Sequence, residues 1–243
     1  MKWLWVTLFQ NLFTLFLYAI SIAILGLSIF PGALFCVFIW KGVSQLELGP
    51  QILSLCFAAV TGYFIFGFTL IVLVGVLRFG LRLGLKEGDY PAFSLGAVKW
   101  AFANGLQLLV SNTFMDFVLL TPFANLVFRV LGAKLGKNVQ INSKYCGDLS
   151  LLEVGDNSVI GGHATVIGHS FERKGFVLRK VRIGKNVVVG LNSVILPGTE
   201  IGDGSIIAAG AIVSKNTKVL PRSVMSGMPA ESSRDRRARK KED

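Results

Sequence analysis

The 243-residue sequence has few of the residues that most enzymes use for chemistry. It has two histidines and three cysteines, and the cysteines (Cys36, Cys56 and Cys146) form no Cys-x-x-Cys pair. This is neither a disulfide framework nor a zinc-ligand pattern, and free thiols are typical of a protein that faces the cytosol. Charge is also absent from two long stretches, residues 3–40 and residues 52–77.

Both uncharged stretches exceed the roughly 20 apolar residues that cross a bilayer. The apolar core of a signal peptide has about 7–15 residues, so the first stretch is too long for one. As a single helix it would overshoot a hydrocarbon core of about 30 Å, and Pro31 offers a break. We expect one span over residues 4–29 with a bent continuation, and a return span over residues 52–77.

Most basic residues near these spans lie at their outer ends. Lys2 precedes the first span, Arg78, Arg82 and Lys86 follow the second, and the connecting loop carries Lys41 and Glu47. The positive-inside rule then predicts a transmembrane hairpin over residues 1–78 in the inner (plasma) membrane, with the rest of the chain in the cytoplasm. The net charge of +11 favours anionic lipid or a phosphorylated small molecule over nucleic acid as a partner.

Residues 79–133 are apolar but interrupted by polar side chains, among them Asp116. An unpaired carboxylate is costly inside a bilayer. We interpret these residues as interfacial or re-entrant amphipathic helices broken at Pro122; the alternative is a third span in which Asp116 has a partner. The basic tail, residues 231–243, is predicted to be disordered or to touch the lipid surface.

From residue 134 the pattern changes, because aliphatic residues recur every six positions. They are Val154, Ile160 and Val166, and then Ile183, Val189, Ile195, Ile201, Ile207, Val213, Val219 and Met225. The residue four places after each is nearly always small or β-branched. A helix would repeat near 3.6 and a strand at 2. Period six indicates a solenoid of triangular coils, with aliphatic side chains inside and small residues near the corners.

The repeat, together with the ending "VSKNTKVLPRSVMSGMPA", resembles the left-handed β-helix of hexapeptide-repeat acyltransferases. The resemblance spans residues 135–230. A narrower likeness, carried by "EGDYPAFSLGAVKWAF", "LLTPFANLVFRVLGAKLG" and "HSFERKGFVLRKVRIG", is to the membrane-embedded terminal module of non-ribosomal peptide synthetases and poly-amino-acid ligases. The predicted fold class is α + β, with transmembrane and interfacial helices followed by a left-handed parallel β-helix over residues 134–230.

Acyl transfer from a thioester needs a base for the nucleophile's proton, and histidine is the natural choice. The resemblance implies one histidine near a loop that leaves the solenoid. Val166 and Ile183 are 17 residues apart, one short of an 18-residue coil, so part of that segment breaks register. We expect His169 at its start to be the general base. Glu172 is expected to orient the imidazole or bind an amine substrate, or to be a solvated charge.

The remaining site residues are carried over from the resemblance. Arg173 and His163 are predicted to bind substrate, although His163, which we expect to point outward from a flat side, is equally a surface histidine. The resemblance implies acyl-CoA or acetyl-CoA as donor, without a metal, bound between subunits of a homotrimer. The residues that match the donor-binding positions are Gly190, Ala209, Ser214, Lys215 and Arg222.

Several functions remain open. The first is acyl transfer to an amine or hydroxyl, with CoA or a carrier protein holding the acyl group and a synthetase as a partner. The second is O-acetylation of a lipid-linked sugar, and the third is a non-catalytic trimeric platform at the membrane. The γ-class carbonic anhydrases share the β-helix but use three histidines on zinc, which two histidines cannot supply. A nucleophilic Cys146 has no histidine near it in the sequence.

Overall fold

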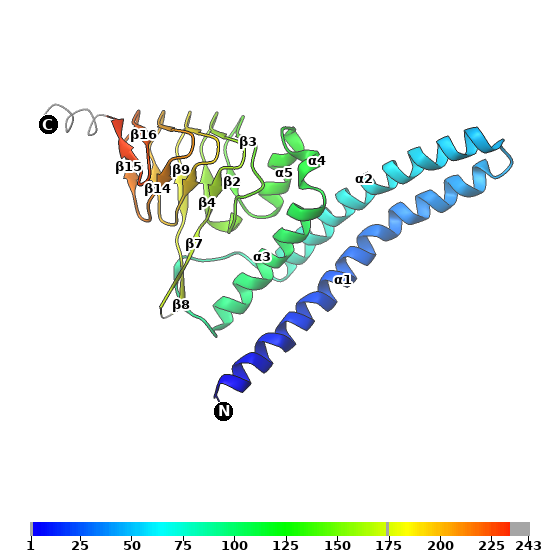
Figure 1. The fold of residues 1–243 in the computed structure, drawn as a ribbon, viewed down its shortest axis with the longest axis horizontal. Coiled ribbons are helices and arrows are strands. Elements are labelled where there is room, and N and C mark those ends of the chain that lie inside the picture. The colour runs from blue at the N-terminus through cyan, green and yellow to red at the C-terminus, as the bar shows by residue number, and fades with distance from the viewer. Residues whose placement is uncertain (1, 174, 234–243) are drawn as a thin grey trace, which may run out of the picture. The chain divides into compact units, whose positions relative to one another are not determined.

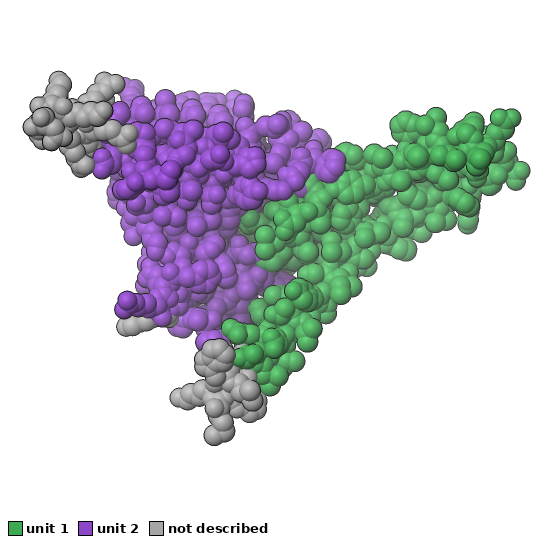
Figure 2. All heavy atoms as spheres, in the orientation of Figure 1, with its two compact units in different colours: residues 1–81, 105–114 green, residues 82–104, 115–243 purple. Residues whose placement is uncertain are grey.

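The computed structural model describes residues 2–173 and 175–233. The chain divides into two compact units (Figure 2). Unit 1 comprises residues 1–81 and 105–114, and unit 2 comprises residues 82–104 and 115–243. Residues 79–133, predicted as one interfacial segment, are therefore shared between the two units. Most of the basic tail lies outside the described residues.

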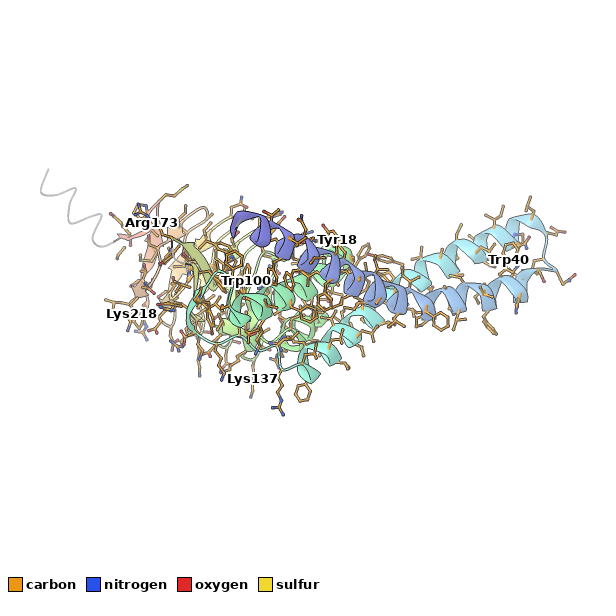
Figure 3. The ribbon with its side chains drawn as sticks, turned by 90° about the horizontal axis from the view of Figure 1, so that it is seen from below. Tyr18, Trp40, Trp100, Lys137, Arg173 and Lys218 are labelled. Carbon is orange, nitrogen blue, oxygen red and sulfur yellow. The ribbon has the colours of Figure 1, made fainter. Side chains whose placement is uncertain are left out.

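Unit 1 is a helical hairpin of α1 (Lys2–Val43) and α2 (Leu48–Gly80), joined by a short turn (Figure 1). Both helices are long and apolar enough to cross a membrane, by length and composition. Their large apolar side chains, such as Ile22, Phe38 and Trp40, are mostly exposed (Figure 3). Such a surface suits lipid rather than water.

The first helix runs without a break through the proline at which the sequence offers one. Helix α1 contains Pro31 and continues to Val43, so the span expected over residues 4–29 and its expected continuation belong to one helix. Next to the proline, a Cβ on Gly32 would lie 2.4 Å from the carbonyl oxygen of Gly62 on α2. The two backbones therefore approach closely at a pair of glycines, which is a common way for apolar helices to pack.

Unit 2 begins with β1 (Gly88–Pro91) and the first turns of α3 (Leu95–Thr113). The helices α4 (Met115–Val118) and α5 (Pro122–Val130) follow, and α5 starts at the proline expected to break the helix. Asp116 of α4 forms a 2.6 Å ion pair with Lys144 of the solenoid. The carboxylate therefore has a partner, but it lies in a short helix rather than in a third long span.

The rest of unit 2 is a parallel β-helix with short strands on each side of its coils (Figure 1). The strands of the solenoid and of the hairpin that leaves it are β2 (Lys134–Leu135), β3 (Gln140–Ile141), β4 (Leu152–Val154), β5 (Val159–Ile160), β6 (Thr165–Val166), β7 (His169–Glu172), β8 (Gly175–Leu178), β9 (Val181–Ile183), β10 (Val188–Val189), β11 (Val194–Ile195), β12 (Glu200–Ile201), β13 (Ile206–Ile207), β14 (Ile212–Val213), β15 (Lys218–Val219), β16 (Val224–Ser226) and β17 (Glu231–Ser232). A short 3-10 helix, η1 (Leu149–Leu151), precedes β4.

The strands form three parallel sheets along the solenoid. Their orders are β15-β12-β9-β4-β2, then β16-β13-β10-β5-β3 with β17 added antiparallel to β16, and β14-β11-β6. Stacked residues such as Arg182 and Glu200 are 18 residues apart. The predicted period of six residues per side is thereby confirmed, and the left-handed sense of the coil stays a prediction.

The interior of the solenoid contains the residues that the period selects. Ile160, Val189 and Ile207 stack in one sheet and are fully buried. The small corner residues are buried as well, and they link successive coils. Ser158 Oγ, for example, donates to the carbonyl of Gly184 at 2.7 Å and accepts from the amide of Val187 at 3.0 Å. A small hydroxyl therefore fits the corner and also satisfies backbone groups there.

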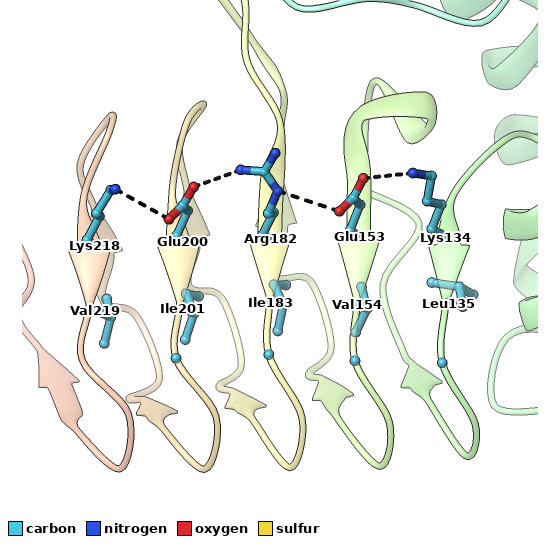
Figure 4. Close-up of a pocket in the computed structure, with 14 residues that line it drawn as sticks. Lys134, Leu135, Glu153, Val154, Arg182, Ile183, Glu200, Ile201, Lys218 and Val219 are labelled. Atoms are coloured by element: carbon cyan, nitrogen blue, oxygen red, sulfur yellow. Dashed lines mark hydrogen bonds and ion pairs between the residues drawn. The ribbon is translucent and has the colours of Figure 1, made fainter.

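The outer face of the five-stranded sheet carries a ladder of alternating charge, which lines a shallow pocket of about 640 Å³ (Figure 4). The ladder consists of Lys134, Glu153, Arg182, Glu200 and Lys218, one residue on each strand. Neighbouring members pair across the strands at distances between 2.7 and 3.7 Å. Each of these pairs is partly exposed and stabilises the fold only slightly.

Candidate active site

The predicted interruption of the repeat is a β-hairpin that leaves the solenoid. Strands β7 and β8 pair antiparallel, and β1 adds to the free edge of β8. Across the hairpin, Val154 and Ile183 pair although 29 residues separate them, instead of the 18 residues found between the later coils. The interruption is thus an insertion of 11 residues between two sides of one coil. The estimate of a coil one residue short is wrong, because Val166 and Ile183 lie on adjacent sides rather than on stacked strands.

His169 is the first residue of this hairpin, and its imidazole contacts a buried carboxylate. Nδ1 of His169 lies 2.6 Å from Oδ2 of Asp148. The Asp148 side chain is 0% exposed and the His169 side chain is 23% exposed. The pair therefore has one fully enclosed member and one that a substrate can reach.

Asp148 is held at a corner of the preceding coil in a left-handed conformation, with φ of 52°. Its neighbour Gly147 donates a backbone hydrogen bond to Val166, which anchors the corner beside the base of the hairpin. Gly168 then donates its amide to Oδ2 of Asp148 at 3.0 Å. A Cβ on Gly168 would lie 3.2 Å from Cβ of Asp148, so glycine permits the close approach of the two segments.

The other carboxylate oxygen is also satisfied. Oδ1 of Asp148 accepts from Nε1 of Trp100 at 2.7 Å and from Nδ2 of Asn104 at 3.2 Å. Burial alone would raise the pKa of Asp148, but the hydrogen bonds from His169, Trp100 and Asn104 outweigh it and hold the pKa below its ordinary value of 3.8. Asp148 is therefore a carboxylate at neutral pH and accepts the Nδ1 proton of His169. This leaves the lone pair on Nε2 of His169 free to take a proton.

Aromatic rings surround the imidazole. The Trp100 ring lies 5.0 Å from that of His169 at an interplanar angle of 66°, and the Phe171 ring lies 5.6 Å from it. Trp100 also packs on Phe176 of β8 at 5.2 Å. Phe176 is buried, whereas Phe171 is 68% exposed. The rings restrict rotation of the imidazole, and the exposed Phe171 ring leaves an open apolar surface beside it.

Glu172 does not orient the imidazole, which corrects one predicted role. Side chains alternate along a strand, so His169 and Phe171 face one side of the hairpin while Ser170 and Glu172 face the other. There Lys215 of the solenoid contacts the Ser170 hydroxyl and lies 3.4 Å from the Glu172 carboxylate. Asp148 takes the orienting position instead. The predicted role of Glu172 in binding an amine stays a prediction.

Arg173 lies in the turn of the hairpin (Figure 3). It lines a pocket of about 760 Å³ with Asp89, Glu172, Phe176 and Lys215, among others. This pocket contains charges of both signs. His169 does not line it. The structure therefore brings Arg173 and Glu172, predicted beside the histidine, together with Lys215, predicted to bind the donor, at a pocket that His169 does not line.

The other predicted residues lie at different corners of the solenoid. His163 is exposed at a corner with φ of 56° rather than on a flat side, and its ring is 5.9 Å from that of Tyr145. Gly190 lies at that same corner one coil later, where a Cβ would be 2.5 Å from the amide of Ala209. Arg222 is at another corner. Exposed Ser214 precedes Lys215 at the hairpin corner. Within one chain these residues do not form a single cluster.

The sequence interpretation missed Asp148, Trp100 and Asn104. For Asp148 a signal was available, because it lies 20 residues before Gly168, close to one coil length, in the otherwise apolar stretch "YCGDLSLL". Trp100 and Asn104 are separated from Asp148 by 48 and 44 residues and lie on a helix outside the repeat. No periodicity relates that helix to the solenoid.

Two other kinds of site were considered in the sequence, a metal centre and a cysteine nucleophile. Within residues 2–173 and 175–233, no three His, Cys, Asp or Glu side chains gather as ligands for a metal ion. Cys146 is buried, and burial raises the pKa of its thiol to about 12. A thiol of that pKa is almost entirely protonated at neutral pH and is a poor nucleophile.

Comparison with known proteins identifies the repeat. Residues 180–215 match the family model described as the hexapeptide repeat of succinyl-transferase, which confirms the hexapeptide repeat predicted from the sequence. No match is found among the curated proteins. The likeness to peptide-synthetase modules stays a prediction.

Solved structures of hexapeptide-repeat proteins are similar to part of the chain. A maltose O-acetyltransferase from Clostridium difficile 630 is 22% identical, with 61% of this chain and 92% of that chain covered and a TM-score of 0.47. A hexapeptide-repeat acetyltransferase from Vibrio cholerae O1 biovar eltor, complexed with acetyl coenzyme A, is 20% identical over 63% of this chain and 96% of that chain, with a TM-score of 0.48. A galactoside acetyltransferase in complex with coenzyme A is 22% identical over 64% and 88%, with a TM-score of 0.43.

Proposed function

Because the chain carries the hexapeptide repeat, we propose that it is an acyltransferase in which the Asp148–His169 pair is the catalytic base. The donor is a thioester, acyl-CoA or an acyl carrier protein, and the acceptor is an amine or a hydroxyl. The observation that carries the proposal is the 2.6 Å contact between Nδ1 of His169 and Oδ2 of Asp148. Histidine fixed by a buried carboxylate is a recurring arrangement for a base that activates a nucleophile.

In the proposed reaction, Nε2 of His169 takes the proton of the acceptor while the acceptor oxygen or nitrogen bonds to the thioester carbonyl carbon. The negative charge of Asp148 stabilises the imidazolium that forms. The carbon–sulfur bond then breaks, and the leaving thiolate takes a proton from His169. The acyl group passes to the acceptor in one direct transfer, and both partner residues return to their starting charge.

The low exposure of the pair supports this assignment. A carboxylate that is 0% exposed is costly unless it is paired and hydrogen-bonded. Four donors surround Asp148, namely His169, Gly168, Trp100 and Asn104. A purely structural solenoid corner does not need a buried charge, since the other left-handed corners of this solenoid carry Asn or Gly, or the exposed His163 and Arg222. The partly exposed imidazole is the accessible end of this arrangement.

The assembly and location follow as parts of the same proposal. We propose a homotrimer that holds the donor between subunits, because the residues matched to donor-binding positions lie at three different corners of each solenoid. We also propose that α1 and α2 anchor the enzyme in the inner membrane and that the site faces the cytoplasm, near anionic lipid. The apolar helices and the basic residues after α2 support this placement.

The decisive experiment measures release of free thiol from acetyl-CoA and succinyl-CoA by the purified full chain, with a panel of amine and hydroxyl acceptors. His169→Ala is expected to lower kcat/KM by roughly 10²- to 10⁴-fold, the usual contribution of a general base. Asp116→Asn, at an exposed position outside the site, is the control and should retain activity within a factor of about two, a difference that amounts to less than 1 kcal/mol. Full activity of His169→Ala would favour the platform function instead.

A further inference from the structure

The hydrogen bonds to Asp148 come from two different parts of unit 2. Oδ2 faces His169 and Gly168 at the base of the hairpin, whereas Oδ1 faces Trp100 and Asn104 of α3. The second pair lies in the sequence before the solenoid begins. One carboxylate therefore connects the imidazole on one side to a helix outside the repeat on the other.

The spacing of the two helical donors fits this task. Trp100 and Asn104 are four residues apart, so they project from the same face of α3. Asn104 Nδ2 also donates to the backbone oxygen of Trp100 at 3.0 Å, which restrains its amide. A single turn of helix thus presents an indole N–H and an amide N–H to the same oxygen.

A small apolar core holds this part of α3 against the hairpin. Leu151, Phe176 and Leu178 form a buried cluster on which Trp100 and Tyr90 pack, together with Leu85 and Ala97. The first turn of α3 fits closely there, since a Cβ on Gly96 would lie 2.1 Å from the Tyr90 ring. The donors are therefore placed by packing, before any substrate arrives.

We infer that Trp100 and Asn104 are positioning residues of the acyl transfer, which fix Asp148 and through it the Nδ1–H tautomer and orientation of His169. The inference rests on the proposed function. Without these donors, Oδ1 of a buried carboxylate would lack partners and the side chain would rotate or draw water in. The solenoid would then retain His169 but lose the fixed base. The segment before the repeat is accordingly part of the catalytic apparatus.

The test compares three variants of the full chain, Trp100→Phe, Asn104→Ala and the double variant, with Asn112→Ala as control. Asn112 is exposed on the same helix. Loss of one hydrogen bond to a charged group is expected to lower kcat about tenfold per variant, with the KM for acetyl-CoA unchanged. Trp100→Phe keeps the ring in the core, and thermal unfolding checks that each variant is folded. Should the double variant not fold, the two single variants decide.

A second readout does not depend on the acceptor. The chain has two histidines, so protein labelled with ¹⁵N-histidine gives two imidazoles, which His163→Gln assigns. Trp100→Phe and Asn104→Ala should shift His169 from a pure Nδ1–H tautomer towards a mixture, while a merely structural role would leave its nitrogens unchanged. An unchanged kcat and an unchanged His169 spectrum in both variants would overturn the inference. If His169→Ala is itself fully active, the proposed function fails instead.

Discussion

Replacing Asp148 by Asn tests the charge at the centre of the site while keeping its shape. The native carboxylate accepts hydrogen bonds on both oxygens, from His169 and Gly168 on one and from Trp100 and Asn104 on the other. An amide has one oxygen and one NH₂ group. In either orientation its NH₂ must face donors that it cannot satisfy.

The magnitude follows from those two orientations. If the NH₂ faces Trp100 and Asn104, two hydrogen bonds to a charged acceptor are lost, at roughly 1.5–3 kcal/mol each. If it faces His169, the imidazole must present a lone pair at Nδ1, and Nε2 then carries the proton. That tautomer cannot act as a base. We expect kcat/KM to fall about 10²- to 10⁴-fold and the free energy of unfolding to fall by about 3 kcal/mol.

The assay is thiol release from acetyl-CoA by the full chain, together with thermal unfolding of the same samples. Asp116→Asn is the matched control, because its exposed pair with Lys144 contributes about 0–1 kcal/mol to stability and lies outside the site. Activity of Asp148→Asn within twofold of the wild type would refute the role of the carboxylate. A loss of stability without a loss of activity would show that Asp148 is structural.

Three further predictions test other parts of the structure. Gly190→Ala should lower the free energy of unfolding by about 1–3 kcal/mol, because its Cβ would meet the backbone of the next coil at 2.5 Å. The control is Gly105→Ala, which has open space in α3 and should leave the free energy of unfolding unchanged or raise it by up to about 1 kcal/mol. Equal melting temperatures for the two variants would contradict the packing argument. The pKa of Asp148 in the folded protein is held below 3.8, so the stability that its carboxylate contributes is present above that pH and is lost as the pH falls through the folded pKa. In thermal melts, the difference in stability between the wild type and Asp148→Asn should therefore disappear only below about pH 3.8. A difference that disappears near pH 6 would be inconsistent with a lowered pKa. Lys215→Met removes the contacts of Lys215 with Ser170 and Glu172, which join the hairpin to the solenoid. Hydrogen exchange in β7 and β8 should therefore accelerate, while the free energy of global unfolding falls by less than about 1 kcal/mol. Unchanged exchange in β7 and β8 would show that these contacts do not hold the hairpin in place.

The sequence predicts the solenoid well because the repeat is local. Each buried aliphatic, such as Ile195 or Ile201, is identified by its distance to the next one, and the corners follow from the same spacing. The start of the hairpin at His169 is found for the same reason, since it is the point where the period fails.

The remainder of the site was not predictable in that way. Asp148 meets His169 only because two successive coils bring their corners together. The insertion between β6 and β9 changes the number of residues in that coil, so stacked positions there cannot be found by counting along the sequence. Trp100 is placed by packing on Phe176, which is a tertiary contact with no sequence spacing of its own. The first helix continues past Pro31, where the sequence offers a break, and the close approach of Gly32 to Gly62 on α2 is likewise a tertiary contact with no sequence spacing of its own.

The charge ladder on the five-stranded sheet has a consequence for how a repetitive chain finds its correct pairing. The interior positions of successive coils are nearly interchangeable, since Val154, Ile183 and Ile201 fill equivalent places. A coil that skipped its neighbour and stacked on the next one would bury its aliphatic residues almost as well. It would, however, bring Glu153 beside Glu200, and like charges on adjacent strands repel. Charge repulsion in the ladder thus disfavours incorrect strand pairings in which the aliphatic core is buried almost as well as in the native pairing. This applies within one chain during folding and between chains that exchange coils.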